Sequence, residues 1–350
     1  MKKILVTGGA GFIGSHTCIH LLERGYEVVL IDSFINSSEK VAKRIIDICK
    51  LKDKFITEKF QVFKADLRKI SLLESVFKEA EESGKPIEGV IHFAGLKSVA
   101  ESLKNPCLYW DVNVGGTINL VKVMKKYDCN VIVFSSSATI YGLAESNFIY
   151  EESEKKPLNP YGVTKLVVEN FLNDIFRSSK KHWSIANLRY FNPVGAHSSG
   201  LIGESPVGNP NNIFPIILDV ASRKIKTLKV FGNDWPTIDG TGVRDYIHVM
   251  DIAESHLQTL EYLFNNETQI INLNLGTGQG TSVLELIQIF EDTNNVRIPY
   301  EISEKREGDA PCVVANTKLA FEIIKWKSKR DLVDICKDGW RWRVNNPNGY

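Results

Sequence analysis

The stretch TGGAGFIGSH, residues 7–16, decides the fold. It follows the apolar run KILVTG (3–8) and opens a helical pattern, so a strand is predicted to turn directly into a helix. Gly8, Gly11 and Gly14 let the backbone turn tightly and approach a pyrophosphate, which the helix N-terminus would bind. A plain tight turn is the alternative, but the strand before and the helix after favour a dinucleotide-binding loop.

Apolar runs and amphipathic stretches alternate through the first half of the chain. The runs are mostly continuous, as expected for strands buried on both faces of a parallel sheet. They cover residues 3–8, 27–32, 60–66, 89–95, 130–136 and 184–190, and helical patterns between them include 71–82, 119–127 and 165–176. The pattern predicts an α/β protein with a Rossmann-type, doubly wound parallel sheet.

The composition changes after residue 190, where Pro, Gly and Asn become frequent. Between residues 191 and 244, the one helical candidate is 214–223. We therefore expect an NAD-binding domain over 1–190 and a smaller, loop-rich α/β substrate domain over 191–350. The strand–helix pattern resumes at 245–263, with Asp251 as an expected helix cap, so the chain is predicted to return to the first domain around 244–275. The final stretch DLVDICKDGWRWRV is predicted to be an amphipathic helix with its Trp residues in the core.

Composition excludes several classes of function. The 43 basic and 42 acidic residues leave a net charge of +1, so nothing indicates a nucleic-acid or membrane partner. The cysteines are isolated and form no CxxC pattern, which argues against a zinc site and against any other metal site. Isolated thiols are also typical of proteins in a reducing cytosol. Interrupted apolar runs predict no secretory signal and no membrane span, so we expect a cytoplasmic protein. The six cysteines are Cys18, Cys49, Cys107, Cys129, Cys312 and Cys336.

The second predicted strand ends in Asp32, about 20 residues past the glycines, where a carboxylate accepts hydrogen bonds from the adenine ribose. That carboxylate repels the additional phosphate of NADP, and the following SFINS (33–37) offers no Arg or Lys to bind it. The expected cofactor is therefore NAD. The alternative is that Asp32 only caps the next helix.

Two further strands end in polar or small residues. Asp66 ends the third, within reach of the adenine, and HFAGLK (92–97) ends the fourth, where Ala94 and Gly95 would let a ligand lie against the backbone. Because ligands bind at the carboxyl ends of parallel strands, these residues predict one ligand edge. His92 lies in an apolar run and is expected to be a buried strand residue, not a catalyst.

The fifth strand ends in SSSATIYG (135–142), and the next helix opens with NPYGVTK. Ser137, Thr139, Tyr161 and Lys165 could therefore converge as proton-handling groups. Tyr161 and Lys165 are four residues apart and share a helix face. The YxxxK pattern alone is weak, and its position beside this strand end gives it weight.

These motifs resemble the extended short-chain dehydrogenase/reductase family, and within it the UDP-glucose 4-epimerases. The resemblance covers nearly the whole chain, and several motifs are specific to the epimerases. They are VTGGAGFIGSHT, IHFAGLKSVAES, FSSSATIYG, NPYGVTK, LRYFNPVGAH, FGNDWPTIDGTGVRDYIHVMD and REGD.

The resemblance implies an isomerase of galactose metabolism, which interconverts UDP-glucose and UDP-galactose by transient oxidation at sugar C4 with tightly bound NAD and non-stereospecific hydride return. Tyr161 is the implied base. Its ordinary pKa of about 10 is too high for neutral pH, so the Lys165 ammonium and the oxidised cofactor must lower it. Ser137 and Thr139 would bind the sugar 4-oxygen or relay its proton.

Site residues follow from the same resemblance. Tyr161 and Ser137 would contact the sugar, and guanidinium groups match diphosphate oxygens. The other implied substrate residues are Asn192, Asn212, Arg244, Arg306, Asp309 and Val313. The implied cofactor residues are Gly8, Gly11, Phe12, Ile13, Gly14, Asp32, Ser33, Asn36, Ser37, Asp66, Leu67, Phe93, Ala94, Gly95, Lys97, Asn113, Tyr161, Lys165 and Phe191.

Two positions depart from the family pattern. Val112 stands where some members carry Asn before the retained Asn113, which removes one possible hydrogen bond to NAD. Val313 stands where a bulky Tyr is associated with exclusion of acetylated sugars, so UDP-N-acetylglucosamine and UDP-N-acetylgalactosamine are expected to be further substrates.

Three rival functions remain at this point. A nucleotide-sugar 4,6-dehydratase would need a carboxylate after Thr139, where Ile140 and Tyr141 stand instead. A UDP-glucuronate epimerase would need one more cation, and a non-catalytic NAD sensor would typically lack the Tyr/Lys pair. The family also predicts a homodimer through helices over roughly 105–127 and 161–177, although those apolar residues could equally pack within one chain.

Overall fold

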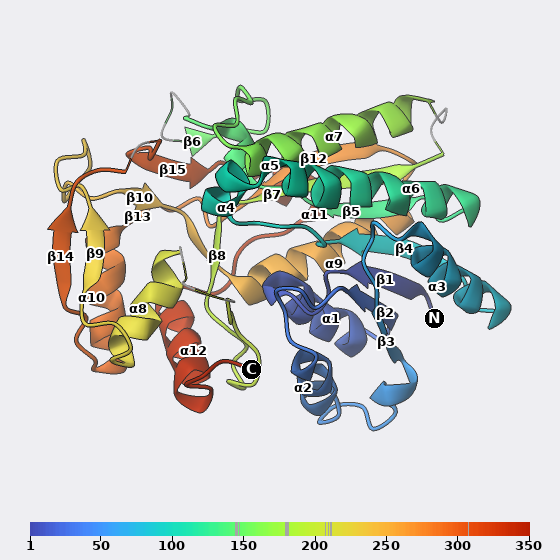
Figure 1. The fold of residues 1–350 in the computed structure, drawn as a ribbon, viewed down its shortest axis with the longest axis horizontal. Helices are drawn as coiled ribbons and strands as arrows, with labels where there is room; N and C mark the ends of the chain where they lie inside the picture. Colours follow the sequence, from blue (N-terminus) through green and yellow to red (C-terminus); the bar gives the residue numbers. More distant parts are fainter. Residues whose placement is uncertain are drawn as a thin grey trace. The chain divides into compact units, whose positions relative to one another are not determined.

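The computed structural model describes residues 1–143, 146, 148–178, 182–206, 208, 210, 212–306 and 308–350. The chain forms two compact units (Figure 1). The first comprises Met1–Gly142, Pro157–Arg189 and Ala253–Leu273, and the second comprises Leu143–Lys156, Tyr190–Ile252 and Asn274–Tyr350. The inclusion of Leu143–Lys156 in the second unit was not foreseen from the sequence, and the predicted functions of the two domains stay predictions.

The first unit is built on a seven-stranded sheet in the order β12-β7-β5-β4-β1-β2-β3 (Figure 1). Every pairing from β7 to β3 is parallel. The order runs outward from β1 in both directions, so the fold is the predicted doubly wound sheet with its switch point between β1 and β4. The strands are β1 (Lys3–Thr7), β2 (Glu27–Asp32), β3 (Phe60–Lys64), β4 (Ile87–His92), β5 (Val131–Ser135), β7 (Ser184–Tyr190) and β12 (Ile270–Leu275).

Helices cover both faces of this sheet, which explains why its central strands are apolar throughout. On one face, side chains from three helices pack with Leu5, Val90 and Ile132 in a buried cluster. On the other, Gly89 leaves room for Leu260 and Phe264 of α9. The helices are α1 (Phe12–Glu23), α2 (Lys40–Cys49), α3 (Ile70–Glu82), α4 (Val99–Lys104), α5 (Pro106–Tyr109), α6 (Gly116–Lys126), α7 (Pro160–Ser178) and α9 (Val249–Asn265), with 3-10 turns η1 (Ile56–Glu58) and η3 (Ala138–Tyr141).

One irregular element was not predicted. The chain between α5 and α6 forms a π-helical turn, η2 (Trp110–Gly115), instead of continuing as an α-helix. Such turns are often found at functional sites, and this one presents Asn113, which is buried.

The second unit has a four-stranded sheet in the order β13-β10-β15-β6 and two strand pairs, β8 with β11 and β9 with β14. Its core contains Phe214 and Phe290, whose ring centroids lie 6.3 Å apart, and the partly buried Trp340 packs against it with its ring centroid 6.1 Å from that of Phe290. Of the two Trp residues predicted to lie in the core, Trp342 is buried and Trp340 only partly so. The elements are β6 (Phe148–Ile149), β8 (Asn192–Val194), α8 (Ile213–Ala221), β9 (Leu228–Phe231), β10 (Val243–Arg244), β11 (Tyr246–His248), β13 (Thr281–Ser282), α10 (Val283–Asn294), β14 (Tyr300–Ser303), β15 (Cys312–Ala315), α11 (Lys318–Ile324) and α12 (Leu332–Asn345).

The predicted cap role of Asp251 is wrong. Helix α9 begins at Val249, so Asp251 lies inside its first turn. Its buried carboxylate accepts hydrogen bonds from the backbone N–H groups of Lys329 and Arg330, each at 3.0 Å, and pairs with the Arg330 guanidinium. Asp251 therefore anchors a distant segment instead of capping its own helix.

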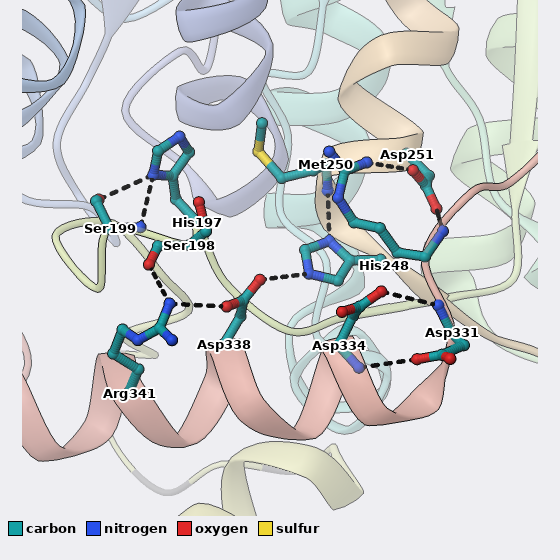
Figure 2. Close-up of polar contacts among 11 residues, drawn as sticks. His197, Ser198, Ser199, His248, Met250, Asp251, Asp331, Asp334, Asp338 and Arg341 are labelled. Atoms are coloured by element: carbon teal, nitrogen blue, oxygen red, sulfur yellow. Dashed lines mark hydrogen bonds and ion pairs between the residues drawn. The ribbon is translucent and has the colours of Figure 1, made fainter. Parts of the chain in front are cut away.

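A second polar contact ties α12 to the chain before α9. His248 is buried, and its Nδ1 accepts a hydrogen bond from the Met250 N–H at 3.1 Å. The other ring nitrogen lies 3.4 Å from Asp338 Oδ2, and Arg341 donates to Asp338 Oδ1 at 3.2 Å (Figure 2). The His248 ring therefore links the chain before α9 to helix α12.

Candidate active site

The glycine loop after β1 is shaped by close backbone packing. Gly8 has φ +68°, and a Cβ there would lie 2.6 Å from the backbone N of Ala94. A Cβ on Gly14 would lie 2.4 Å from the Gly8 carbonyl oxygen. Gly11 precedes α1, and within the described residues no side chain caps this helix start, so its first N–H groups face the loop. The turn is therefore a cradle for an anion at a helix N-terminus.

Asp32 lies at the end of β2, beside this loop. Its carboxylate is buried and accepts hydrogen bonds from the N–H groups of Ala10 at 3.0 Å and Phe34 at 2.9 Å. The Ser37 hydroxyl donates to the same carboxylate at 2.9 Å. Asp32 thus organises the loop that carries Ser33 and Asn36, and Asn36 is exposed.

Asp66 has a partner that was not foreseen from the sequence. Arg68 contacts both carboxylate oxygens, at 2.6 to 3.1 Å, and this pairing lowers the pKa of Asp66. Arg68 also reaches Asp111 at 2.9 Å. The carbonyl of Leu67 accepts a hydrogen bond from Asn119 at 3.2 Å, so the segment after β3 is fixed on two sides.

A buried hydrogen-bond chain supports the end of β4. The Thr7 hydroxyl accepts from the Ala94 N–H at 3.4 Å and lies 2.7 Å from His92 Nδ1. His92 Nε2 lies 2.8 Å from the Thr117 hydroxyl, which donates to the Asn113 carbonyl at 2.6 Å. Burial lowers the pKa of His92 to about 3, so the ring is neutral. The prediction that His92 is a buried strand residue is confirmed.

The Asn113 side chain holds the loop after β4. Its Oδ1 accepts from the Leu96 N–H at 2.8 Å, and its Nδ2 donates to the Leu96 carbonyl at 3.1 Å and to Thr164 at 3.0 Å. A Cβ on Gly95 would lie 3.0 Å from Asn113 Oδ1. Asn113 therefore joins the loop that carries Lys97 to helix α7, while its predicted contact with NAD stays a prediction.

Tyr161, Ser137 and Thr139 come together where β5 ends and α7 begins. The Thr139 hydroxyl donates to Ser137 Oγ at 2.9 Å, and Ser137 hydrogen-bonds to the Tyr161 phenol. Desolvation raises the pKa of Tyr161, whereas the Ser137 hydrogen bond and the positive charge of Lys97 lower it. Since Ser137 accepts from Thr139, its own proton is directed at the phenol oxygen, as a phenolate requires.

Lys165 lies one helical turn after Tyr161 and is buried. Its ammonium donates to the Ser135 carbonyl at 2.7 Å and lies 5.9 Å from the centre of the Tyr161 ring. Burial lowers the pKa of Lys165 to about 8, although the charge of Glu169 raises it. The lysine therefore changes charge close to neutral pH.

In the second unit, four predicted substrate residues lie together. Arg244 Nη2 is 4.0 Å from Asp309 Oδ1, and Arg306 Nε is 3.2 Å from Asp309 Oδ2. Val313 is paired with Arg244 in adjacent strands. Arg244 also donates to the Ala310 carbonyl at 2.9 Å, so its guanidinium is held in place.

Asp245, which was not singled out from the sequence, supports this group. Its buried carboxylate accepts from Thr277 N at 2.8 Å, Gly278 N at 3.0 Å and Ala315 N at 3.2 Å. Its carbonyl accepts from the N–H of Asn192 at 3.1 Å, after the buried Phe191. Asn212, the remaining predicted substrate residue, is the N-cap residue of helix α8.

Two other residues were missed near Lys165. Glu169 and Arg189 form a buried ion pair at 2.6 Å behind the serine-rich strand end. A charged residue within SIANLRY, a run expected to be a buried strand, was the available signal for Arg189. Among the described residues, no group of three or more His, Cys, Asp or Glu side chains could hold a metal ion, and no helix is long and apolar enough to cross a membrane.

Comparison with known proteins identifies the family. A model of the family described as GDP-mannose 4,6 dehydratase matches residues 5–339. The UDP-glucose 4-epimerase of Bacillus subtilis is 48% identical over 348 residues, which cover 99% of this chain and 98% of that protein.

Solved structures agree. The UDP-glucose 4-epimerase of Stenotrophomonas maltophila, with bound NAD and formylated UDP-arabinopyranose, has a TM-score of 0.93 and 44% identity, and 99% of each chain is covered. The enzyme of Bifidobacterium longum, in complex with NAD+ and UDP, has a TM-score of 0.91 and 42% identity over 100% of both chains. With the glycine cradle and the Tyr161–Lys165 pair in place, these likenesses lead to one conclusion: the chain belongs to the UDP-glucose 4-epimerases of the extended short-chain dehydrogenase/reductase family.

Proposed function

We propose that this protein interconverts UDP-glucose and UDP-galactose by transient oxidation at sugar C4, with Tyr161 as the base. The observation that carries the mechanism is the convergence of Thr139, Ser137 and Tyr161 beside the Lys165 ammonium. Full-length relatives that are UDP-glucose 4-epimerases support the reaction itself.

The described residues fit NAD. The cradle at Gly8 and Gly14 has no room for a side chain, the uncapped start of α1 suits a pyrophosphate, and Asp32 places a carboxylate at the end of β2. The other predicted contacts are Phe12, Ile13, Ser33, Asn36, Ser37, Asp66, Leu67, Phe93, Ala94, Gly95, Lys97, Asn113 and Phe191. When bound, NAD supplies the acceptor and then the donor of the hydride that leaves C4 and returns.

Tyr161 removes the proton of the sugar 4-hydroxyl. Burial alone would keep the phenol protonated, so its neighbours decide whether it can act. Ser137 donates a hydrogen bond to the phenolate, and the cations of Lys97 and Lys165 stabilise its charge. Thr139 donates to Ser137 and thereby keeps the Ser137 proton directed at the phenolate.

Residues of the second unit bind the nucleotide portion. Arg244 and Arg306 pair with the diphosphate, Asp309 accepts from the uridine ribose, and Asn192 and Asn212 contact phosphate or sugar. Asp309 also pairs with both guanidinium groups and holds them in one cluster. Fixed guanidinium groups lose less conformational entropy on binding the diphosphate.

A second substrate class follows from Val313. This side chain is partly buried and lies beside Arg244 in the paired strand, where a valine leaves more space than a tyrosine. The enzyme is therefore proposed to act also on UDP-N-acetylglucosamine and UDP-N-acetylgalactosamine. A homodimer through the helices over 105–127 and 161–177, and a cytoplasmic location, are likewise proposals.

The test is turnover by purified protein without added cofactor. Incubation with UDP-galactose should produce UDP-glucose, and heat should release NAD from the same preparation. UDP-glucuronate is the parallel substrate for the uronate rival, and formation of a 4-keto-6-deoxy sugar would reveal a dehydratase. No UDP-glucose from a preparation that carries NAD would reject the proposed function.

A further inference from the structure

One face of helix α7 contacts three successive serines. Tyr161, Lys165 and Glu169 are spaced by four residues, so their side chains lie along the same side of the helix. Each contacts one residue of Ser135–Ser137 at the end of β5. The phenol bonds to Ser137, the ammonium to the Ser135 carbonyl, and the carboxylate accepts from the Ser136 hydroxyl.

Glu169 is held by a buried guanidinium. Arg189 donates through Nε to Oε1 at 2.9 Å and through Nη2 to Oε2 at 2.6 Å. Its Nη1 donates to the Tyr141 hydroxyl at 2.9 Å. Both charged side chains are only 2–3% exposed. An apolar pair of similar volume often stabilises a core as well as a buried ion pair does, so stability alone does not account for these charges.

We propose that Glu169 is a positioning residue for the epimerase reaction: held by Arg189, it fixes the end of β5 and places a negative charge one helical turn behind Lys165. This inference rests on the proposed roles of Tyr161 and Lys165. Glu169 contacts neither phenol nor sugar in this scheme and acts through its neighbours.

Among the charged groups around Lys165, Glu169 is the one that shifts its pKa. From α7 the facing groups are Tyr161 and Glu169, and from β4 it is His92, which is neutral because burial lowers its pKa to about 3. Arg189 on β7 is paired with Glu169 itself. The Glu169 charge raises the pKa of Lys165 against the burial that lowers it.

The direction of the effect follows from the active protonation state, which has Tyr161 deprotonated and Lys165 protonated. A nearby negative charge favours ammonium, so Glu169 raises the pKa of Lys165, which lies one helical turn away, whereas Tyr161 lies two turns away. Removing the Glu169 charge must therefore move the alkaline limb of the pH–rate profile, which reports the loss of the Lys165 ammonium, toward acid. A charge one helical turn away is expected to displace this limb by about 1 pH unit.

The experiment records kcat against pH for UDP-galactose with holoenzyme variants. Glu169→Gln keeps hydrogen-bonding oxygen while removing the charge. Glu169→Leu with Arg189→Met replaces the whole ion pair by apolar side chains and avoids an uncompensated guanidinium. Tyr141→Phe is the matched control, because it removes a neutral partner of Arg189 from the same buried network.

Glu169→Gln should show the alkaline limb displaced toward acid by about 1 pH unit, with the control unmoved, whatever the height of the curve. The apolar pair removes one negative and one positive charge together, so it should show a smaller displacement. A lower curve at an unchanged position would mean that Glu169 only stabilises the fold, and would overturn the inference. So would failure of the apolar pair to fold, since the inference treats the fold as independent of these charges. Retained activity in Tyr161→Phe would instead reject the proposed function.

Discussion

At the scale of single residues, a half-buried phenol and a buried ammonium share one proton in the proposed mechanism. Desolvation raises the pKa of the Tyr161 phenol and lowers that of the Lys165 ammonium to about 8, so burial opposes the charged form of each. The Ser137 hydrogen bond and the Lys97 charge lower the pKa of Tyr161, and the Glu169 charge raises that of Lys165, so these neighbours oppose the effect of burial on each group. Because the two groups interact, their titration belongs to the pair.

The pH dependence of the rate follows from Lys165. Its ammonium is present below its pKa and is lost as the pH rises through about 8, so kcat should decline above that pH. Lys165→Met should lower kcat by about 100-fold or more and abolish the alkaline decline. Lys78→Met, at an exposed lysine on α3, is the control and should reproduce the wild-type profile. An unchanged alkaline limb in Lys165→Met would contradict the assignment.

Val313 governs substrate range in this account. Val313→Tyr should reduce turnover of UDP-N-acetylglucosamine by about 10-fold or more while sparing UDP-galactose, because the larger ring fills the space for the acetyl group. Val313→Ala should retain both activities. Coupled assays with the two substrates measure the ratio, and wild-type protein that turns over UDP-galactose alone would end the idea.

At the scale of elements, the glycine turn fixes the cofactor end of the first unit. A Cβ on Gly14 would collide with backbone, whereas one on Gly115 would meet its nearest atom at an ordinary 3.6 Å. Gly14→Ala should therefore yield protein with little bound NAD, and Gly115→Ala protein with the normal amount. The absorbance of NAD released by heat measures the cofactor content of both variants. Equal NAD content would contradict the proposed role of the glycine turn in binding the pyrophosphate.

The segment anchored by Asp251 offers a stability test. Asp251→Asn leaves the Arg330 guanidinium without its carboxylate, and should lower the free energy of unfolding by about 2–4 kcal/mol. Asp292→Asn, on the exposed side of α10, should change it by less than about 0.5 kcal/mol. Denaturant titrations compare the variants. Equal stability of the two would show that the anchoring contact is dispensable.

Elements with a strong period were predictable from the sequence, and irregular ones were not. The buried strands and α7 carry continuous or amphipathic patterns, so their existence followed from periodicity. The π-helical turn at Trp110–Gly115 has no such signature, since its geometry depends on the contacts that Asn113 makes with Leu96 and Thr164. For the same reason Asp251 looked like a cap, although its partners lie about 78 residues away.

At the scale of the whole molecule, the class of fold and the family were accessible from the sequence. The order of the seven-stranded sheet agrees with the doubly wound prediction. Site residues in family motifs could be named, but the supporting groups Glu169, Arg189 and Asp245 were not, although Arg189 and Asp245 stand inside two of those motifs. Their importance comes from buried contacts between distant segments, which spacing along the chain does not encode.

The most direct test of the central claim is the rate of UDP-galactose conversion by Tyr161→Phe compared with wild-type protein, each carrying its own NAD. The account predicts a loss of about 100- to 10,000-fold in kcat with cofactor content and folding preserved, because the phenylalanine keeps the ring and removes only the proton acceptor. Conversion by the Phe variant at the wild-type rate would contradict it.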